Sequence, residues 1–126
     1  MTARAIRQFR GQRAYHAGAA AENRIAQDYE RRGISVARRR WRGTGGEIDL
    51  ILRDGEALIF VEVKQSRSIA LAAERLNARQ MRRIYASASE FLGQEPRGAL
   101  TDVRFDVALV DASGAFEIIE NAFGQG

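Results

Sequence analysis

Two apolar segments in the middle of the chain, residues 47–53 and 56–65, are separated by only the dipeptide Asp54-Gly55. An Asp-Gly pair between such segments is one of the strongest local signals for a β-hairpin with a two-residue turn. A hairpin at this point commits the centre of the chain to a pair of antiparallel strands. The other segments of the chain then have to pack around that pair.

The segments on either side of the hairpin show helical or strand-like patterns. Small and apolar residues recur at every third or fourth position in 14–32, and Gly33 follows where such a helix would end. The other predicted elements are a strand over 34–41, a helical region over 68–93 with a break or N-cap at Asn77, and strands over 103–111 and 115–123. The predicted order is α-β-β-β-α-β-β, which indicates the α/β fold class.

Length and composition indicate one globular domain. The chain has 126 residues, of which 45% are hydrophobic and 29% are charged. We expect a flexible basic arm over 1–13 and a single domain over 14–126. The sequence has no cysteine, no apolar leader and no apolar run of membrane-spanning length, so we expect a cytoplasmic protein without a membrane segment.

The charge pattern permits a polyanionic partner. The formal net charge is +4, and Lys64 is the only lysine among the 20 basic residues. Arginines grouped around an aromatic residue are typical of nucleic-acid contacts, although a solvated charged face is the commoner explanation of any one cluster. The predicted nucleic-acid-binding residues are Arg38, Arg39, Arg40, Trp41, Arg42, Arg67, Arg79, Arg82 and Arg83.

The position of the hairpin turn decides which side chains share a face of the sheet. With Asp54 and Gly55 as the turn residues, the predicted cross-strand pairs are Arg53–Glu56, Asp49–Phe60 and Glu47–Glu62. The face predicted to lie against the core is wholly apolar and carries Ile48, Leu50, Leu52, Ala57, Ile59, Val61 and Val63. The opposite face, predicted as the working side, carries Glu47, Asp49, Ile51, Phe60, Glu62 and Lys64.

Asp49 and Glu62 are predicted to be diagonal neighbours on the working side, about 7–8 Å apart at the backbone. Two carboxylates in this arrangement can reach one divalent cation, Mg²⁺ or Mn²⁺. Such an ion would stabilise charge on a phosphate and lower the pKa of a water molecule. The alternative is a solvated hairpin face on which Lys64 forms an ordinary cross-strand ion pair with one of the acids.

Lys64 is predicted one pleat beyond Glu62 on the same face. We expect it to orient or deprotonate a water molecule, or to neutralise charge that develops on a phosphate. An amine is a compact charge that can lose its proton, whereas a guanidinium is planar and effectively always protonated. This difference gives a chemical reason for one lysine in a chain that otherwise uses arginine.

The segment “GGEIDLIL…LIFVEVK” resembles the PD-(D/E)xK nuclease signature, with Asp49 as the acid and Glu62-Val63-Lys64 as the ExK element. The further segments “GAAAEN”, “FVEVKQSRS” and “RFDVALV”, in this order, are similar to the YraN family of predicted endonucleases. Members of that family are small bacterial proteins similar to archaeal Holliday-junction resolvases. The combination of segments is a much more specific signal than the short nuclease signature alone.

This resemblance implies a restriction-endonuclease-like fold with a central mixed sheet of about five strands between helices. It implies Mg²⁺- or Mn²⁺-dependent hydrolysis of phosphodiester bonds in branched or structured DNA, by a symmetric homodimer and without a small-molecule cofactor. It also implies that Glu22, on the first helix, is a third metal ligand beside Asp49 and Glu62. The family usually has a lysine where this chain has Gln80, which we predict to be a catalytic residue that contacts a phosphate or water.

Two other interpretations fit the same sequence. One is a non-catalytic nucleic-acid-binding module that keeps the fold without the chemistry. The other is a partner-docking protein in nucleic-acid processing, whose basic face binds acidic protein surfaces. The intact trio of Asp49, Glu62 and Lys64 favours the enzyme, because a module without catalysis has no need of all three.

Overall fold

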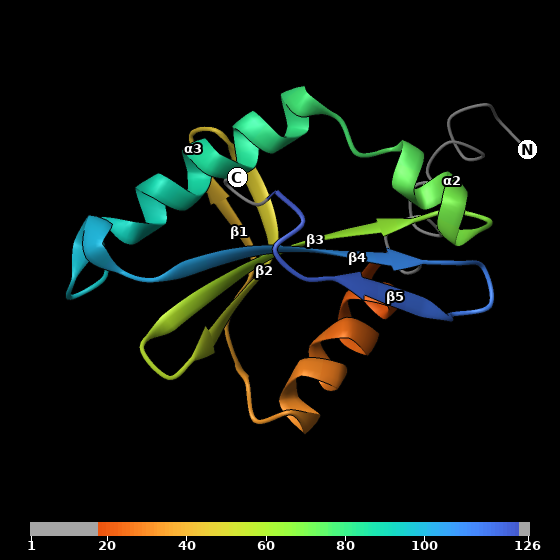
Figure 1. Ribbon diagram of the computed structural model, residues 1–126, viewed down its shortest axis with the longest axis horizontal. Coiled ribbons are helices and arrows are strands. Elements are labelled where there is room, and N and C mark those ends of the chain that lie inside the picture. Colours follow the sequence, from red (N-terminus) through yellow and green to blue (C-terminus); the bar gives the residue numbers. More distant parts are fainter. Residues whose placement is uncertain (1–17, 124–126) are drawn as a thin grey trace, which may run out of the picture.

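A five-stranded mixed sheet forms the centre of the computed structural model, which describes residues 18–123 (Figure 1). Its strands lie in the order β1 (Ser35–Gly43), β2 (Gly46–Asp54), β3 (Ala57–Gln65), β4 (Val103–Val110) and β5 (Phe116–Ile119). Neighbouring strands are antiparallel except β3 and β4, which run parallel. The prediction of an α/β fold with a central mixed sheet is confirmed, while the predicted arm over 1–13 lies outside the described residues.

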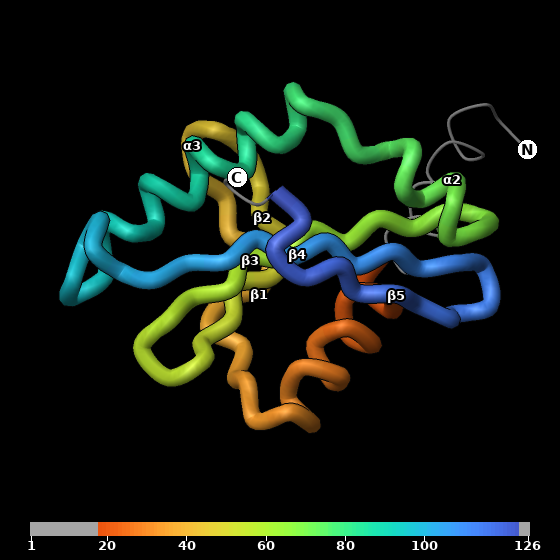
Figure 2. The backbone as a smooth tube through the Cα atoms, viewed as in Figure 1, coloured from red at the N-terminus to blue at the C-terminus, as the bar shows by residue number. Residues whose placement is uncertain are grey.

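Helices cover both faces of this sheet. The N-terminal helix, which covers 18–31 within the described residues, lies on one face, and α3 (Ala78–Leu92) lies on the other (Figure 1). The chain crosses from β3 to β4 through α2 (Ile69–Glu74), α3 and the short 3-10 helix η1 (Gly98–Leu100), as the tube in Figure 2 shows. No helix within 18–123 is long and apolar enough to cross a membrane.

The predicted break in the second helical region is confirmed at Asn77. This residue is the N-cap of α3, and its side-chain oxygen accepts a hydrogen bond from the backbone N–H of Gln80 at 2.9 Å. An asparagine cap satisfies one of the backbone donors that a helix start leaves without a partner. The cap therefore fixes the first turn of α3, and with it the position of Gln80.

Buried apolar residues lie on both faces of the hairpin. The cluster under the N-terminal helix contains Leu50, Leu52, Ile59 and Val61. The cluster under α3 contains Ile48, Ile51, Leu58 and Phe60. Because α3 covers the face predicted as the working side, most of that face is a second hydrophobic core. Polar side chains that could bind a ligand are restricted to the part of the hairpin beyond Phe60.

The turn between β2 and β3 is displaced from its predicted position by one residue. Asp54 pairs with Ala57, so Gly55 and Glu56 are the turn residues, and Gly55 has a φ of 62°. Glycine at the first central position is typical of a type II′ turn, whereas the prediction placed it second. The predicted pairs Arg53–Glu56, Asp49–Phe60 and Glu47–Glu62 are wrong, and the observed pairs include Arg53–Leu58 and Ile51–Phe60.

The alternation of side chains along β1 and β2 is interrupted beside Asp49. Arg40 has a φ of 47°, in the left-handed region that non-glycine residues rarely adopt. Its neighbour Trp41 pairs with Ile48, and both pack in the cluster under α3, whereas Leu50 packs on the opposite face. Ile48 thus lies on the other face from the one predicted, and the irregularity sets Asp49 at a break in the strand pattern.

A buried polar network joins the N-terminal helix to β4. The Tyr29 hydroxyl donates a hydrogen bond to Asp106 at 2.6 Å, and Arg104 donates two more to the same carboxylate. The backbone N–H of Asn121 donates a fourth, in a turn where Asn121 has a φ of 51°. Because all of these donors serve a carboxylate with 0% exposure, Asp106 has a structural role.

The same turn shortens the last strand. The strand predicted over 115–123 ends at Ile119, because the chain turns at Asn121 instead of continuing along β4. After the turn the backbone N–H of Ala122 donates to the Phe105 carbonyl at 2.8 Å, and Phe123 is buried at 7% exposure. Phe123 therefore packs in the core after the turn, at a position where the sequence predicted the end of a strand.

Candidate active site

Asp49 lies where the ladder between β2 and β3 ends. Regular pairing extends to Leu50 and Val61, and the next step of the same register places Asp49 opposite Glu62. At this point the Asp49 side chain replaces a backbone contact, because its Oδ2 accepts a hydrogen bond from the Val63 N–H at 2.7 Å. The displaced turn therefore makes the two acids direct cross-strand neighbours instead of the predicted diagonal ones.

The carboxyl groups of Asp49 and Glu62 form a buried pair. Glu62 is only 9% exposed. The pKa of Asp49 is raised to about 8, first by burial and then by the charge of Glu62 and a hydrogen bond between the two carboxyl groups. The Val63 N–H and the charge of Lys64 lower the same pKa to a smaller extent. At neutral pH Asp49 therefore keeps its proton in the metal-free protein, and a divalent cation in place of that proton would compensate both charges.

Lys64 adds the third member of this group. Its Nζ lies 3.3 Å from Oε1 of Glu62, and the exposed fraction of its side chain is 14%. Such a low exposure is unusual for a lysine, whose charged end normally remains in water. The structure thus brings together Asp49, Glu62 and Lys64, as the sequence predicted.

Two carboxylates meet at this site, whereas the sequence predicted three. In the part of the chain that the structure describes, no group of three His, Cys, Asp or Glu side chains could hold a metal ion. Glu22 is buried, and its Oε2 accepts a hydrogen bond from Nε of Arg40 at 2.9 Å. Burial raises the pKa of Glu22, and the bond to Arg40 opposes that shift. Glu22 is therefore held in an ion pair beside the site.

The Asp49–Glu62 pair fits Mg²⁺ or Mn²⁺ without a third acid. Mg²⁺ is commonly bound through one or two carboxylates and keeps several water molecules. Oxygen atoms are also the ligands that Mn²⁺ prefers among protein side chains. Burial and the nearby charge of Glu62, which raise the pKa of Asp49, are the electrostatic conditions that a divalent cation relieves.

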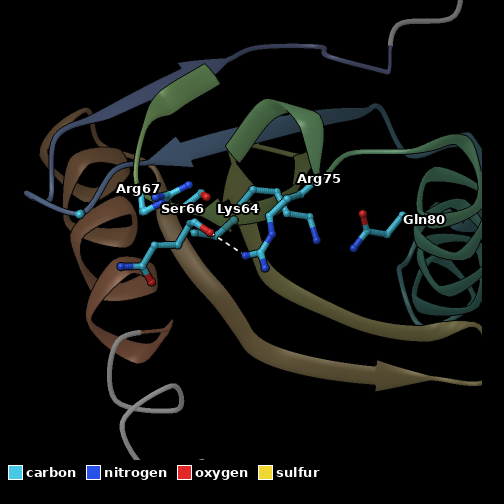
Figure 3. Close-up of a pocket in the computed structure, with 8 residues that line it drawn as sticks. Lys64, Ser66, Arg67, Arg75 and Gln80 are labelled. Carbon is cyan, nitrogen blue, oxygen red and sulfur yellow. Dashed lines mark hydrogen bonds between the residues drawn. The ribbon is translucent and has the colours of Figure 1, made fainter. Parts of the chain in front are cut away.

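A pocket of about 710 Å³ opens beside Lys64 at the end of β3 (Figure 3). Its lining includes Ser66, Arg67, Arg75 and Gln80, and no acidic side chain. Figure 3 shows the side chains of Lys64 and Gln80 pointing toward one another across this space. Oε1 of Gln80 is buried and has no hydrogen-bond partner among the described residues. A bound water or ligand would satisfy it.

Sequence reasoning missed Ser66 and Arg75 in this pocket. Arg75 is the C-cap of α2, and its Nη1 donates a hydrogen bond to the Gln65 carbonyl at 2.8 Å. Nothing in its immediate sequence distinguishes Arg75 from the other arginines of the chain. The available signal was that Arg75 lies only five residues before Gln80 in the sequence. Because the helix breaks at Asn77, both side chains can line the same pocket.

The β1 residues predicted to bind nucleic acid have contacts within the protein. Trp41 is partly buried and packs edge-on against Phe91, with the ring centroids 5.3 Å apart. The arginines bond to neighbouring groups: Arg38 to the Ala37 carbonyl, Arg39 to Asn23, Arg40 to Glu22 and Arg42 to Glu47. A nucleic-acid contact by this group stays a prediction and would require an exchange of these partners.

The other predicted arginines are different. Arg67 at the end of β3 and Arg79, Arg82 and Arg83 on α3 are exposed, and none of them has an acidic partner within residues 18–123. Arg79 directly precedes Gln80, which lines the pocket. Of these four arginines, Arg67 belongs to the lining of the pocket, and the three on α3 lie outside it.

Asp49→Asn is expected to raise the free energy of unfolding of the metal-free protein. The gain should be larger at pH 9 than at pH 5 by on the order of 2 kcal/mol. The raised pKa of Asp49 means that the folded state holds this proton more tightly than the unfolded state does. Its favourable contribution is complete below the ordinary aspartate pKa and is lost as the pH rises through about 8. Thermal unfolding in EDTA at both pH values measures the difference.

The control for this experiment is Asp28→Asn, which removes a partly exposed acid that pairs with Arg32 at 3.2 Å. It should change stability by a similar small amount at both pH values. A difference between Asp49→Asn and wild type that does not grow with pH would contradict the electrostatic description of the carboxyl pair.

Comparison with known proteins gives a family for the chain and no activity. Residues 21–110 match the uncharacterised protein family UPF0102. A UPF0102 protein of Ruegeria pomeroyi is 63% identical over 117 residues, which cover 93% of this chain and 95% of that protein. A UPF0102 protein of Cereibacter sphaeroides strain KD131 is 64% identical over 113 residues, which cover 90% of this chain and 97% of that protein. A UPF0102 protein of Dinoroseobacter shibae is 50% identical over 115 residues, which cover 91% of this chain and 86% of that protein.

Proposed function

We propose a function from the site of this chain, which belongs to the uncharacterised protein family UPF0102: metal-dependent hydrolysis of phosphodiester bonds in DNA. The observation that carries the proposal is the buried Asp49–Glu62 pair with Nζ of Lys64 3.3 Å from Glu62. The basic pocket next to this group supports a phosphate-bearing substrate. The preference for branched or structured DNA rests on the resemblance to the YraN family and to junction resolvases.

Asp49 and Glu62 are the residues that would hold Mg²⁺ or Mn²⁺. The chemistry that such an ion supplies when bound is stabilisation of charge on the phosphate and a lower pKa for a water ligand. The protein contributes the fixed positions of the two carboxylates. Asp49 is held by the Val63 N–H, and Glu62 by the amine of Lys64.

Lys64 and Gln80 act on the substrate side of the pair. The Lys64 amine is placed to donate a hydrogen bond to a phosphate oxygen or to orient the attacking water. In the hydrolysis, the water oxygen forms a bond to phosphorus and loses a proton, while the bond from phosphorus to the leaving sugar oxygen breaks and that oxygen gains a proton. The amide of Gln80, which points toward Lys64 (Figure 3), is placed to contact the same water or phosphate.

A second candidate function is a nucleic-acid-binding module without catalysis. It is favoured by one observation, the meeting of two carboxylates instead of three within residues 18–123. The two candidates differ in a measurable way. A binding module would show steep salt dependence of DNA affinity and no cleavage with any metal ion.

The experiment that tests the proposed function is incubation of the protein with end-labelled four-way junction, flap, duplex and single-stranded DNA, with Mg²⁺, Mn²⁺ or EDTA. We expect metal-dependent nicking, strongest on the junction. Resolution of a junction needs two cuts, so the proposal includes a symmetric homodimer and predicts paired nicks in opposite strands. Absence of metal-dependent nicking on every substrate would reject the enzyme and leave the binding module.

A further inference from the structure

We infer that the pocket beside Lys64 binds a phosphodiester group of the cleaved DNA strand, the one that neighbours the phosphodiester at the carboxyl pair. Arg67 and Arg75 are its charged ligands. The identity of the strand rests on the proposed function. The pocket would fix the position of the strand on the protein and contact the phosphate part of the nucleotide. Its charge, its construction and its lining support this assignment.

The two guanidinium charges of the pocket are not compensated by a carboxylate of the described residues. Neither Arg67 nor Arg75 has a carboxylate partner within residues 18–123, and no acidic residue lines the pocket. Several arginines elsewhere in the fold do have acidic partners, as Arg53 has Glu95 at 2.8 Å and Arg104 has Asp106 at 2.9 Å. Two unpaired guanidinium groups and an amine around one concave space favour an anion there.

The wall of this pocket is held in place by the sheet. The backbone N–H of Ser66 donates to the Val110 carbonyl at 3.0 Å, so the chain remains attached to β4 beyond the end of β3. Arg75 donates one hydrogen bond from Nη1 to the Gln65 carbonyl, and its other N–H groups have no described partner. One end of the guanidinium is therefore anchored while the remaining donors are available to a ligand, as Figure 3 shows by the dashed line at Arg75.

The lining indicates recognition of backbone and not of bases. It offers cations, a hydroxyl and amide groups, but no aromatic ring on which a base could stack. Contacts of this kind position the phosphate backbone and carry no sequence information. The volume of about 710 Å³ exceeds the space that a single phosphate occupies and lies within the range of ligand pockets. The pocket therefore suits a segment of strand, read independently of its sequence.

Lys64 connects this pocket to the carboxyl pair. It lines the pocket and also contacts Glu62, so a phosphate in the pocket and a phosphate at the pair lie on opposite sides of one side chain. Successive phosphates of one strand can occupy two such adjacent positions. This juxtaposition places the strand across the end of β3 and toward the exposed arginines of α3.

The test is the binding of a fluorescein-labelled four-way junction, measured by fluorescence anisotropy over a series of salt concentrations with Ca²⁺ in place of Mg²⁺. Arg67→Gln and Arg75→Gln are each expected to weaken binding about 5–10-fold and to reduce the magnitude of the salt slope by about 1. The losses should be equal on a junction of scrambled sequence, because both junctions present the same phosphates. Unchanged affinity and slope in both variants, or losses that depend on sequence, would overturn the inference.

Arg97→Gln is the matched control. Arg97 is exposed, pairs with Glu56 at 3.7 Å, and lies near the hairpin turn, at the opposite end of β3 from the pocket. It removes the same charge and should leave affinity and slope near those of wild type. Arg67→Gln separates binding from structure, because Arg67 makes no hydrogen bond or ion pair with a described residue. An equal loss in Arg97→Gln would show a general charge effect and overturn the assignment of the pocket.

Competition distinguishes a strand from a free anion. An unlabelled short DNA strand is expected to displace the junction, and inorganic phosphate at the same concentration is not. Equal displacement by phosphate would overturn the strand as the occupant.

Binding at the pocket and cleavage at the carboxyl pair can be rejected independently of one another. Weakened binding in the pocket variants without cleavage by wild type would keep the pocket and reject the enzyme, whereas cleavage by wild type with unchanged binding in both variants would do the reverse.

Discussion

Asp49→Asn is expected to reduce the single-turnover rate of Mg²⁺-dependent junction cleavage by at least about 10³-fold. The substitution keeps the shape of the side chain and an oxygen that can accept the hydrogen bond from Val63 N–H. It removes one of the two negative charges on which the binding of a divalent cation depends. Since the same variant is expected to be more stable at high pH, its loss of cleavage would not reflect unfolding.

Asp28→Asn serves again as the control, because Asp28 lies on the N-terminal helix in a surface ion pair and should not affect cleavage. DNA binding in Ca²⁺ by Asp49→Asn should stay within a few-fold of wild type, since phosphate contacts supply most of the affinity. Wild-type cleavage rates in Asp49→Asn would show that any nuclease activity arises elsewhere on the molecule.

Lys64→Arg is expected to lose about 10²–10³-fold in cleavage rate while DNA affinity remains near that of wild type. The variant retains a positive charge between the carboxyl pair and the pocket. It replaces a compact amine with a larger planar group that is effectively always protonated. The side chain at this position is only 14% exposed, so the larger guanidinium must also displace the groups around it.

Arg97→Lys provides the comparison, because it replaces a guanidinium with an amine at an exposed position outside the site. It should retain cleavage, since Arg97 lies at the opposite end of β3 from Lys64. If Lys64→Arg cleaved as fast as wild type, the chemical reason for a lysine at this position would be wrong, even if the carboxyl pair still bound a metal ion.

Hydrophobic patterning predicted the elements of the fold because it reports burial directly. The strands, the break at Asn77 and the central hairpin lie within a few residues of their predicted positions. Patterning failed where a backbone irregularity was needed. Ile48 lies on the other face from the one predicted, beside the stretch of β1 where Arg40 is left-handed, and no residue type near Arg40 signals that conformation.

The turn type was the other source of error. Asp54-Gly55 indicated a hairpin correctly, but Gly55 can supply a positive φ at either central position of a two-residue turn. The one-residue displacement preserved which residues share a face, because the turn still contains two residues. It changed the relation of Asp49 and Glu62 from diagonal to direct, which strengthens the argument for a shared ion.

The parts of the site that the sequence did not predict depend on contacts between segments far apart in the chain. Asp49, Glu62 and Lys64 lie on one hairpin, so local geometry was sufficient to bring them together. The pairing of Glu22 with Arg40 depends on how the N-terminal helix meets β1, and the place of Arg75 depends on the path of α2. Neither contact leaves a pattern within a single segment of the sequence.

The most direct test of the central claim, that Asp49 and Glu62 form a divalent-cation site, is a calorimetric titration of the metal-free protein with Mn²⁺. Wild type is expected to bind Mn²⁺, whereas Asp49→Asn and Glu62→Gln should bind at least about tenfold more weakly and Asp28→Asn should bind as wild type does. At pH 7, repetition in buffers of different ionisation enthalpy should reveal release of roughly one proton, because Asp49, with a pKa of about 8, holds a proton that the ion would displace. Mn²⁺ binding that is unchanged in both Asp49→Asn and Glu62→Gln, or absent from wild type, would contradict the account.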